Sequence, residues 1–332
     1  MALAGVVGIV ALGAWVPPAQ GALECGDTIT KDKTLKEDLA CPLDTNGLSI
    51  NGDGVTLDMN GHTISAAPQA DSSALQVAVS EDVTVVDGKL RGFNVGLNVA
   101  SSADVTLKTM DVRKAQGWGL YVTSADHVRL LDSTVRGPGE IGVLTLGSTD
   151  HVKIAGNDLR NLGMEIQGDD HRIVGNEISS PNEPGVAVIE GTGSELERNR
   201  ISDVTGGGGI VLQAGVDEVR VEENTVEGAE FGGILTSSGA GPAMIVRNEV
   251  RNVNFNGFFV AGTAVATLRG NLASGSNNGD GIHVEDDDTL IEDNRVINND
   301  QHGIESSSAN GSGNVARRNG ITPQCMPESL CA

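Results

Sequence analysis

Aromatic residues are scarce in this 332-residue chain, at 2% of the total, so its core must be built from Val, Ile, Leu and Ala. Basic residues are also few: 22 Lys and Arg stand against 45 Asp and Glu, for a formal net charge of −23. An acidic excess of this size disfavours nucleic acid and anionic membranes as partners of the whole surface. Cysteine is missing between Cys41 and Cys325, which restricts disulfides and thiolate metal sites to the two ends of the chain.

Glycine is abundant, at 45 residues, and it marks a short repeat. The clearest copy is GGIVLQAGVDEVRVEENTVEGA, residues 208–229, in which three short runs alternate apolar and polar residues as half-buried strands do. A glycine precedes the first run in steps of 21 to 24 residues, at Gly96, Gly119, Gly142, Gly163, Gly185, Gly209, Gly233, Gly257, Gly281 and Gly303. Segments this short cannot bury their own apolar faces, so stacked copies must close one another's core.

A second column of the repeat is asparagine, between the second and third runs. It occurs at Asn157, Asn176, Asn199, Asn224, Asn248, Asn271, Asn294 and Asn319, and earlier copies have His62, Gly88, Met110 and Ser133 there. Asparagine tolerates the left-handed backbone of a sharp bend, and stacked side-chain amides can bond one another. We therefore expect a ladder of amides at this bend.

The two ends of the chain differ from the repeats. Residues 1–21 combine an apolar run with small residues, which predicts a signal peptide and a secreted or periplasmic protein without a membrane anchor. We expect residues 22–47 to cap the first coil, 48–320 to form the coils and 321–332 to form a tail. Cys25 with Cys41 and Cys325 with Cys331 would each form a local disulfide, and a metal site is the alternative for these pairs.

The opening CGDTIT…DLAC, the LDMNGHTI coil, the GI-x-V and GN-x-I runs and the closing QCMPESLC resemble exported β-helix-repeat proteins of the pectate-lyase-like class. That class includes carbohydrate-binding and sugar-hydrolase β-helices. The resemblance implies an all-β fold, a single-stranded right-handed parallel β-helix of about eleven coils with three short strands each. It implies little about activity, because many functions occur on this fold. The NTD, DD, GHG and RIK set of polygalacturonases and the DPHD of alginate epimerases are absent.

In lyases and hydrolases of this class the groove follows the outward face of the first strand and the loop before it. One cluster at these positions is basic and aromatic: Arg91, Arg113, Arg136, Arg160, Trp118, Tyr121, Glu140 and Glu165. The arginines recur at one position of successive coils, so they should stack about 4.8 Å apart. Such a column suits the carboxylates of an acidic polysaccharide, with Trp118 stacked on a sugar ring. The alternative is a solvated ladder paired with Asp111, Asp158 and Glu140.

A second cluster at groove positions is acidic and contains histidine: Asp280, His283, Glu285, His302 and Glu305. Asp280 and His302 share the position before the strand glycine, and His283 and Glu305 share the position two residues after it. A carboxylate beside a histidine could act as general acid and base, or could hold a cation such as Ca²⁺. A polar outer surface is the alternative interpretation. No other cofactor is indicated.

A third column pairs aspartate with histidine at the start of the second strand, as Asp126–His127, Asp150–His151 and Asp170–His171. Three histidines in register could bind a transition metal, but we interpret the column as surface.

Three functions follow from these features. The first is an enzyme, a lyase, hydrolase or epimerase, that binds an acidic polysaccharide along the groove. The second is a non-catalytic exported solenoid that binds glycan or forms part of a surface or matrix. The third is an accessory protein for metal delivery, which rests on the histidine column alone. We expect the chain to be a monomer.

Overall fold

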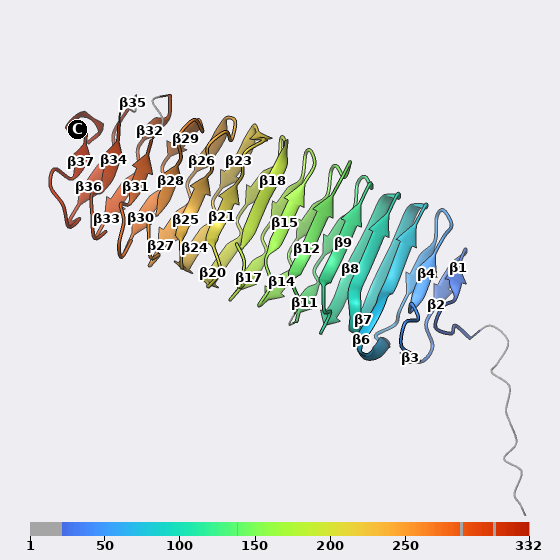
Figure 1. Ribbon diagram of the computed structural model, residues 1–332. Helices are drawn as coiled ribbons and strands as arrows, with labels where there is room; N and C mark the ends of the chain where they lie inside the picture. Colours follow the sequence, from blue (N-terminus) through green and yellow to red (C-terminus); the bar gives the residue numbers. More distant parts are fainter. Residues whose placement is uncertain (1–21, 138, 286–287, 308–309, 332) are drawn as a thin grey trace, which may run out of the picture.

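The computed structural model describes residues 22–331 apart from 138, 286–287 and 308–309, so the predicted signal peptide lies outside the described residues. Its turns stack in one direction from the N-terminal to the C-terminal end (Figure 1). The expected all-β parallel β-helix is confirmed, with about 13 turns where we expected eleven. Within the described residues, helical structure is limited to one 3-10 turn, η1 (Glu328–Leu330), and no helix is long and apolar enough to cross a membrane.

Three parallel sheets run along the solenoid, because each turn contributes strands that pair with the equivalent strands of the next turn. The first sheet contains the opening strand of each turn. Its strands are β1 (Thr28–Ile29), β4 (Leu48–Ile50), part of β6 (Thr63–Ala78), part of β7 (Glu81–Ala100), β9 (Trp118–Thr123), β12 (Ile141–Leu146), β15 (Met164–Gln167), β18 (Val186–Thr192), β21 (Gly208–Leu212), β25 (Gly232–Thr236), β28 (Phe258–Val260), β31 (Ile282–Val284), β34 (Ile304–Ser306) and β37 (Cys325–Met326).

The second sheet follows the bend after the first. Its strands are β2 (Lys33–Thr34), β5 (Thr56–Asp58), parts of β7 and of β8 (Ala103–Arg113), β10 (Arg129–Leu131), β13 (Lys153–Ala155), β16 (Arg172–Val174), β19 (Glu195–Glu197), β23 (Val219–Glu222), β26 (Ala243–Val246), β29 (Ala266–Arg269), β32 (Leu290–Glu292) and β35 (Asn310–Ser312). The short β22 (Val216–Asp217) pairs with the end of β18 in the connecting loops.

The third sheet completes each turn. Its strands are β3 (Leu39–Cys41), parts of β6, β7 and β8, β11 (Thr134–Arg136), β14 (Asp158–Arg160), β17 (Glu177–Ser179), β20 (Arg200–Val204), β24 (Thr225–Ala229), β27 (Glu249–Arg251), β30 (Leu272–Ser274), β33 (Arg295–Ile297) and β36 (Val315–Arg317). Strands β1, β2 and β3, inside the expected cap, already pair with β4, β5 and β6, and β37 pairs with β34. The ends therefore add turns that the repeat pattern did not reveal.

The core is a continuous column of aliphatic side chains inside the coil. In β21 Ile210 and Leu212 are fully buried while Val211 between them is partly exposed, as the alternation predicts. Only glycine fits directly before Ile210 in this strand, because the backbone of the next turn lies too close for a Cβ atom. A Cβ atom on Gly209 would lie 2.8 Å from the carbonyl oxygen of Gly233 in the next turn. Adjacent turns thus approach too closely for a side chain at this column.

The asparagine ladder is buried between the second and third sheets. The side-chain amide of Asn224 donates to Asn248 Oδ1 at 3.0 Å and to the Leu196 carbonyl at 2.8 Å, and its oxygen accepts the Asn199 amide at 2.9 Å. The same pattern links Asn157, Asn176, Asn199, Asn224, Asn248, Asn271, Asn294 and Asn314.

Two expectations about this ladder are wrong. Its last member is Asn314 and not Asn319, because the final turn is shorter, with 20 residues between Asn294 and Asn314. The left-handed residue of each bend precedes the asparagine, as Glu223 does with φ 56° before Asn224. The asparagine is therefore selected for its hydrogen bonds and not for its backbone conformation.

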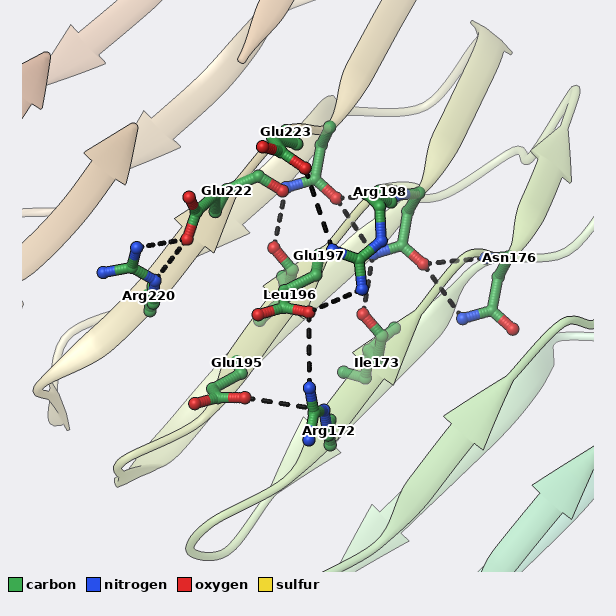
Figure 2. A network of polar contacts seen from close by, with 12 residues as sticks. Arg172, Ile173, Asn176, Glu195, Leu196, Glu197, Arg198, Arg220, Glu222 and Glu223 are labelled. Atoms are coloured by element: carbon green, nitrogen blue, oxygen red, sulfur yellow. Dashed lines mark hydrogen bonds and ion pairs between the residues drawn. The ribbon is translucent and has the colours of Figure 1, made fainter. Parts of the chain in front are cut away.

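The outward face of the second sheet carries alternating charges, which Figure 2 shows around β19 and β23. Glu197 lies 2.9 Å from Arg198 and 3.4 Å from Arg172, and Arg198 also lies 3.7 Å from Glu223. Both arginine side chains are more than half exposed, so each pair contributes about 0–1 kcal/mol. We interpret this face as a charge-balanced solvent surface.

Both expected disulfides are present, Cys25–Cys41 at the N-terminal end and Cys325–Cys331 at the C-terminal end. The first joins the chain before β1 to the end of β3, and the second joins β37 to the residue after η1. Each therefore closes a loop within a terminal turn, where a solenoid has a neighbour on one side only.

The ladder generates a stability prediction. Replacing Asn224 by Ala should lower the free energy of unfolding by about 1–3 kcal/mol, because it leaves buried amide partners in both neighbouring turns unpaired. The matched control is Gln213→Ala, at an exposed position one residue after β21. Chemical denaturation followed by circular dichroism measures both variants. Equal midpoints would show that the ladder does not stabilise this bend.

Candidate functional site

The outward side chains of the first sheet form one continuous column. In register from turn to turn it comprises Asn98, Tyr121, Leu144, Glu165, Ala187, Val211, Leu235, Phe259, His283, Glu305 and Met326. Both clusters expected at the groove contribute to this column. Tyr121 and His283 lie seven strand spacings apart along it, about 34 Å at ~4.8 Å each.

Exposure divides this column into separate parts. Leu144 and Ala187 are only 5% and 2% exposed, so the accessible column is interrupted between Tyr121 and β21, where Glu165 is partly exposed. From Val211 onward every member is at least partly exposed. The accessible stretch therefore runs from β21 to β37 and ends at the acidic and histidine cluster.

Asp280, His283, His302 and Glu305 converge there, and we call them the His–carboxylate centre. His283 Nδ1 lies 2.8 Å from Asp280 Oδ2 and 3.5 Å from Glu305 Oε2. His302 Nδ1 lies 3.6 Å from Asp280 Oδ1 and 3.7 Å from Glu305 Oε2. The Asp280 side chain is 3% exposed and that of Glu305 is 35% exposed, so the centre is buried on one side and accessible on the other.

The protonation of the centre follows from its hydrogen bonds. The hydrogen bond to Asp280 raises the pKa of His283 above its usual value, although partial burial opposes this. Burial also opposes ionisation of Asp280, but hydrogen bonds from His283, Glu305 and the backbone N–H of His302 hold its pKa below the usual range.

The strands and bends of the last turns position these four side chains. His283 and Glu305 are directly paired in β31 and β34, while Asp280 and His302 lie in the bends before those strands. The Asp280 backbone N–H donates to Asn256 Oδ1 at 2.8 Å, and Asp280 Oδ1 accepts the His302 N–H at 2.7 Å. A second, shorter amide ladder holds the same bends together, through Ser276, Asn299, Asn319 and Gln324.

Aromatic side chains lie beside the centre. The rings of Phe259 and His283 are 5.5 Å apart. Phe231 and Phe255, in the bends before β25 and β28, stack at 6.4 Å and are 52% and 49% exposed. On the other side of the centre is an open depression of about 400 Å³, lined by His283, Glu285, Glu305, Ser307, Met326 and Pro327. Aromatic faces next to buried ionisable groups are typical of a binding site.

The arginine column, Arg91, Arg113, Arg136 and Arg160, is in register as expected, at the end of the third strand of each turn. Asp111 pairs with Arg91 at 2.6 Å and with Arg113 at 2.9 Å, and Asp158 pairs with Arg136 and Arg160, both at 2.9 Å. Hydrogen bonds from Arg160 and Arg136 hold the pKa of Asp158 below its usual value, against partial burial.

Asp111 and Asp158 thus each pair with two guanidinium groups, which leaves a local excess of positive charge. A depression of about 590 Å³ follows it, lined by Arg113, Lys114, Arg136, Asn161, Ser180 and Asn182. The aromatic members of this cluster pack together: the Trp118 and Tyr121 rings stack at 5.1 Å with 24° between their planes. Burial, with a contribution from Glu183, raises the pKa of Glu165.

The Asp–His column does not hold three equivalent histidines. The His127 and His151 rings stack at 4.5 Å. The Asp126 carboxylate lies 2.9 Å from His127 Nδ1 and 2.8 Å from His151 Nδ1. His171 is buried instead. Its Nδ1 accepts the Val152 N–H, so its Nε2–H must donate to the Gln167 carbonyl, and burial lowers its pKa. His171 is therefore a neutral structural histidine.

Sequence reasoning missed Phe259, Phe231 and Phe255. Phe259 occupies the position two residues after the strand glycine, the same position as His283 and Glu305, so counting from Gly257 would have found it. Phe231 and Phe255 lie two residues before the strand glycines of their turns. The signal for all three residues is therefore their fixed distance from the glycine column.

Comparison with known proteins supports the architecture. The sequence matches the family described as right handed beta helix region over residues 95–255 and 141–284. No match was found among curated protein sequences.

Solved structures similar to this chain include three proteins that act on or bind carbohydrate by their descriptions. A mutant of the periplasmic alginate epimerase AlgG is 12% identical, with a TM-score of 0.53, over 81% of this chain and 66% of that one. The catalytic unit of a GH87 α-1,3-glucanase from Streptomyces thermodiastaticus strain HF3-3 is 15% identical, with a TM-score of 0.58, over 90% and 63%. A mutant tailspike of E. coli bacteriophage HK620, in complex with a hexasaccharide, is 9% identical, with a TM-score of 0.51, over 87% and 64%.

The chain spans just under two thirds of the length of each of these proteins. At such low identity the likeness concerns the fold alone. The family match is stronger, because its two ranges together cover more than half of the chain. The chain therefore belongs to the right-handed β-helix family.

Proposed function

We propose that this protein binds a polysaccharide along the outward face of the first sheet, from β21 to β37, and acts on it at the His–carboxylate centre. The observation that carries the proposal is the adjacency of Phe259 to that centre, with ring centroids of Phe259 and His283 5.5 Å apart. A sugar ring packed on Phe259 would have its neighbour along the polymer over the buried carboxylate and histidine groups.

The surroundings of the centre support a polymer as the ligand. The accessible column is apolar before the centre, at Val211 and Leu235, and an open depression continues beyond it. Polysaccharides run parallel to such a groove, whereas a small ligand needs an enclosed pocket. The described carbohydrate ligands or substrates of the structural neighbours agree with this choice.

The arginine column favours an acidic polymer in particular. Its four guanidinium groups share two carboxylates, so they retain capacity for bidentate bonds to carboxylates of a ligand. Because this column lies several turns from the centre, it would engage only a long chain. Cleavage or epimerisation of a uronate polymer is the reaction class that combines both features.

Phe259 provides the test of sugar binding. Phe259→Ala should raise the Kd for oligosaccharides of the bound polymer by about tenfold, since it removes the aromatic platform beside the centre. The control is Met244→Ala, which truncates an exposed apolar side chain on the second sheet. Affinity electrophoresis or calorimetry compares the two. If both variants bind like the parent, the groove does not run over β28.

The charge of the ligand is tested at the other cluster. Arg113→Gln combined with Arg136→Gln should weaken binding of long uronate polymers, and added salt should weaken the parent in the same way by screening. Arg172→Gln with Arg198→Gln removes two arginines that are 52% and 56% exposed, in β16 and directly after β19, and should leave binding unchanged. If the Arg113→Gln and Arg136→Gln substitutions leave polymer binding unchanged, the arginine column is not part of the binding site.

Catalysis is tested separately from binding. Glu305→Gln should abolish turnover of a uronate polymer while oligosaccharide affinity stays within about threefold, because the amide keeps the shape of the side chain but cannot act as a general acid or base. Glu227→Gln, an exposed glutamate of the third sheet, is the control. The assay uses pectin, alginate and related polymers, each with and without Ca²⁺. Binding by the parent without turnover of any polymer would favour the non-catalytic solenoid.

A further inference from the structure

We infer that the His–carboxylate centre binds one divalent transition-metal ion, through His283, His302, Asp280 and Glu305. The inference goes beyond the proposed function, because it concerns the four side chains alone and stands whether or not a glycan binds. Ligand atoms of Asp280, His283 and Glu305 all lie within 4.8 Å of one another, and His302 Nδ1, from the same turn as Glu305, lies 3.6 and 3.7 Å from the two carboxylates.

The distances from the histidine nitrogens to the carboxylate oxygens can be compared with the edges of a tetrahedral site. Bonds of about 2.0–2.1 Å from Zn²⁺ to nitrogen and oxygen give tetrahedral edges of about 3.4 Å. Three of these four distances are 3.5, 3.6 and 3.7 Å, and the fourth, from His283 Nδ1 to Asp280 Oδ2, is a hydrogen bond of 2.8 Å. An ion would replace that hydrogen bond, and the His302 side chain would move toward the other three ligands.

His302 supplies an independent observation. It is 9% exposed, and its buried Nδ1 atom has no hydrogen-bond partner among the described residues although it faces two carboxylates. A buried polar atom without a partner costs about 1–3 kcal/mol. The 3.6 and 3.7 Å separations to Asp280 and Glu305 are too long for hydrogen bonds but suit two ligands of a common ion. Coordination would satisfy this nitrogen.

The ligands are held by the regular part of the fold. His283 and Glu305 are strand neighbours in β31 and β34, and Asp280 is fixed through the His302 backbone N–H and Asn256. Carboxylates that are hydrogen-bonded in this way keep their orientation toward a metal. The site is thus preorganised by backbone pairing, and not by a flexible loop.

The donor set selects the kind of ion. Ca²⁺ takes six to eight oxygen ligands and Mg²⁺ keeps several waters, so neither suits a centre that presents two imidazoles. Imidazole with carboxylate suits Zn²⁺ and related first-row ions. A competing cluster, Asp126 with His127 and His151, has side chains that are 45 to 49% exposed, and among the described residues neither of its histidines has a buried nitrogen without a partner.

Zn²⁺ binding to the metal-free protein tests the inference. The parent for the experiment is the His127→Ala/His151→Ala variant, which removes the competing surface pair. Calorimetry should find one Zn²⁺ per chain, and Co²⁺ should give the intense visible absorption of a tetrahedral complex. His302→Gln and Glu305→Gln should each weaken Zn²⁺ binding by more than about tenfold. Loss of a residue that only hydrogen-bonds to a metal ligand already lowers metal affinity by about 10–100-fold. Unchanged circular dichroism in the metal-free state verifies that both variants fold.

The outcomes separate this inference from the proposed function. Absence of stoichiometric Zn²⁺ binding by the parent, or Zn²⁺ affinity that is the same in both variants, overturns the metal site. Oligosaccharide binding is measured on the same samples in EDTA. Zn²⁺ binding without glycan binding retains the metal site and rejects the glycan groove, and the reverse result rejects the metal site alone.

Discussion

Hydrogen bonding between equivalent positions of adjacent turns is the interaction on which the molecule depends. No turn has a core of its own, so Ile210 and Leu212 are buried only because the turns on both sides cover them. The asparagine ladder extends the backbone pattern to side chains, and Asn224 bonds to the turn before it and the turn after it. Because side chains alternate along a strand, a register error of one residue would turn the outward column into the core.

The sequence was sufficient to predict the fold because its period is imposed by contacts at every turn. Glycine recurs where the chain of the next turn leaves no room for Cβ, and asparagine recurs where an amide must bond both neighbours. The ends were harder. The first turn lacks the asparagine column, and the last is shortened, so that Asn314 takes the ladder position and Asn319 joins the second ladder.

The sequence predicted which residues of the candidate site lie side by side, but not how deeply each side chain is buried. Counting from the strand glycine placed His283 beside Glu305, and Asp280 beside His302, as the structure has them. Burial depends on how each bend folds over its neighbours, which the period does not encode. His171 shows this: it follows the spacing of His127 and His151, yet it turns inward because the Val152 N–H and the Gln167 carbonyl offer it two bonds.

The His–carboxylate centre lies near the C-terminal end, so its stability depends on the terminal turns. A solenoid loses structure from its ends inward, because a terminal turn is held by one neighbour only. Glu305 pairs directly with Met326 of β37, so a single turn separates the centre from the open end of the stack. The Cys325–Cys331 disulfide lies in that turn. Fraying there would dismantle the centre while the arginine column, far inside the stack, remained intact, and the disulfide therefore stabilises this centre more than the rest of the solenoid.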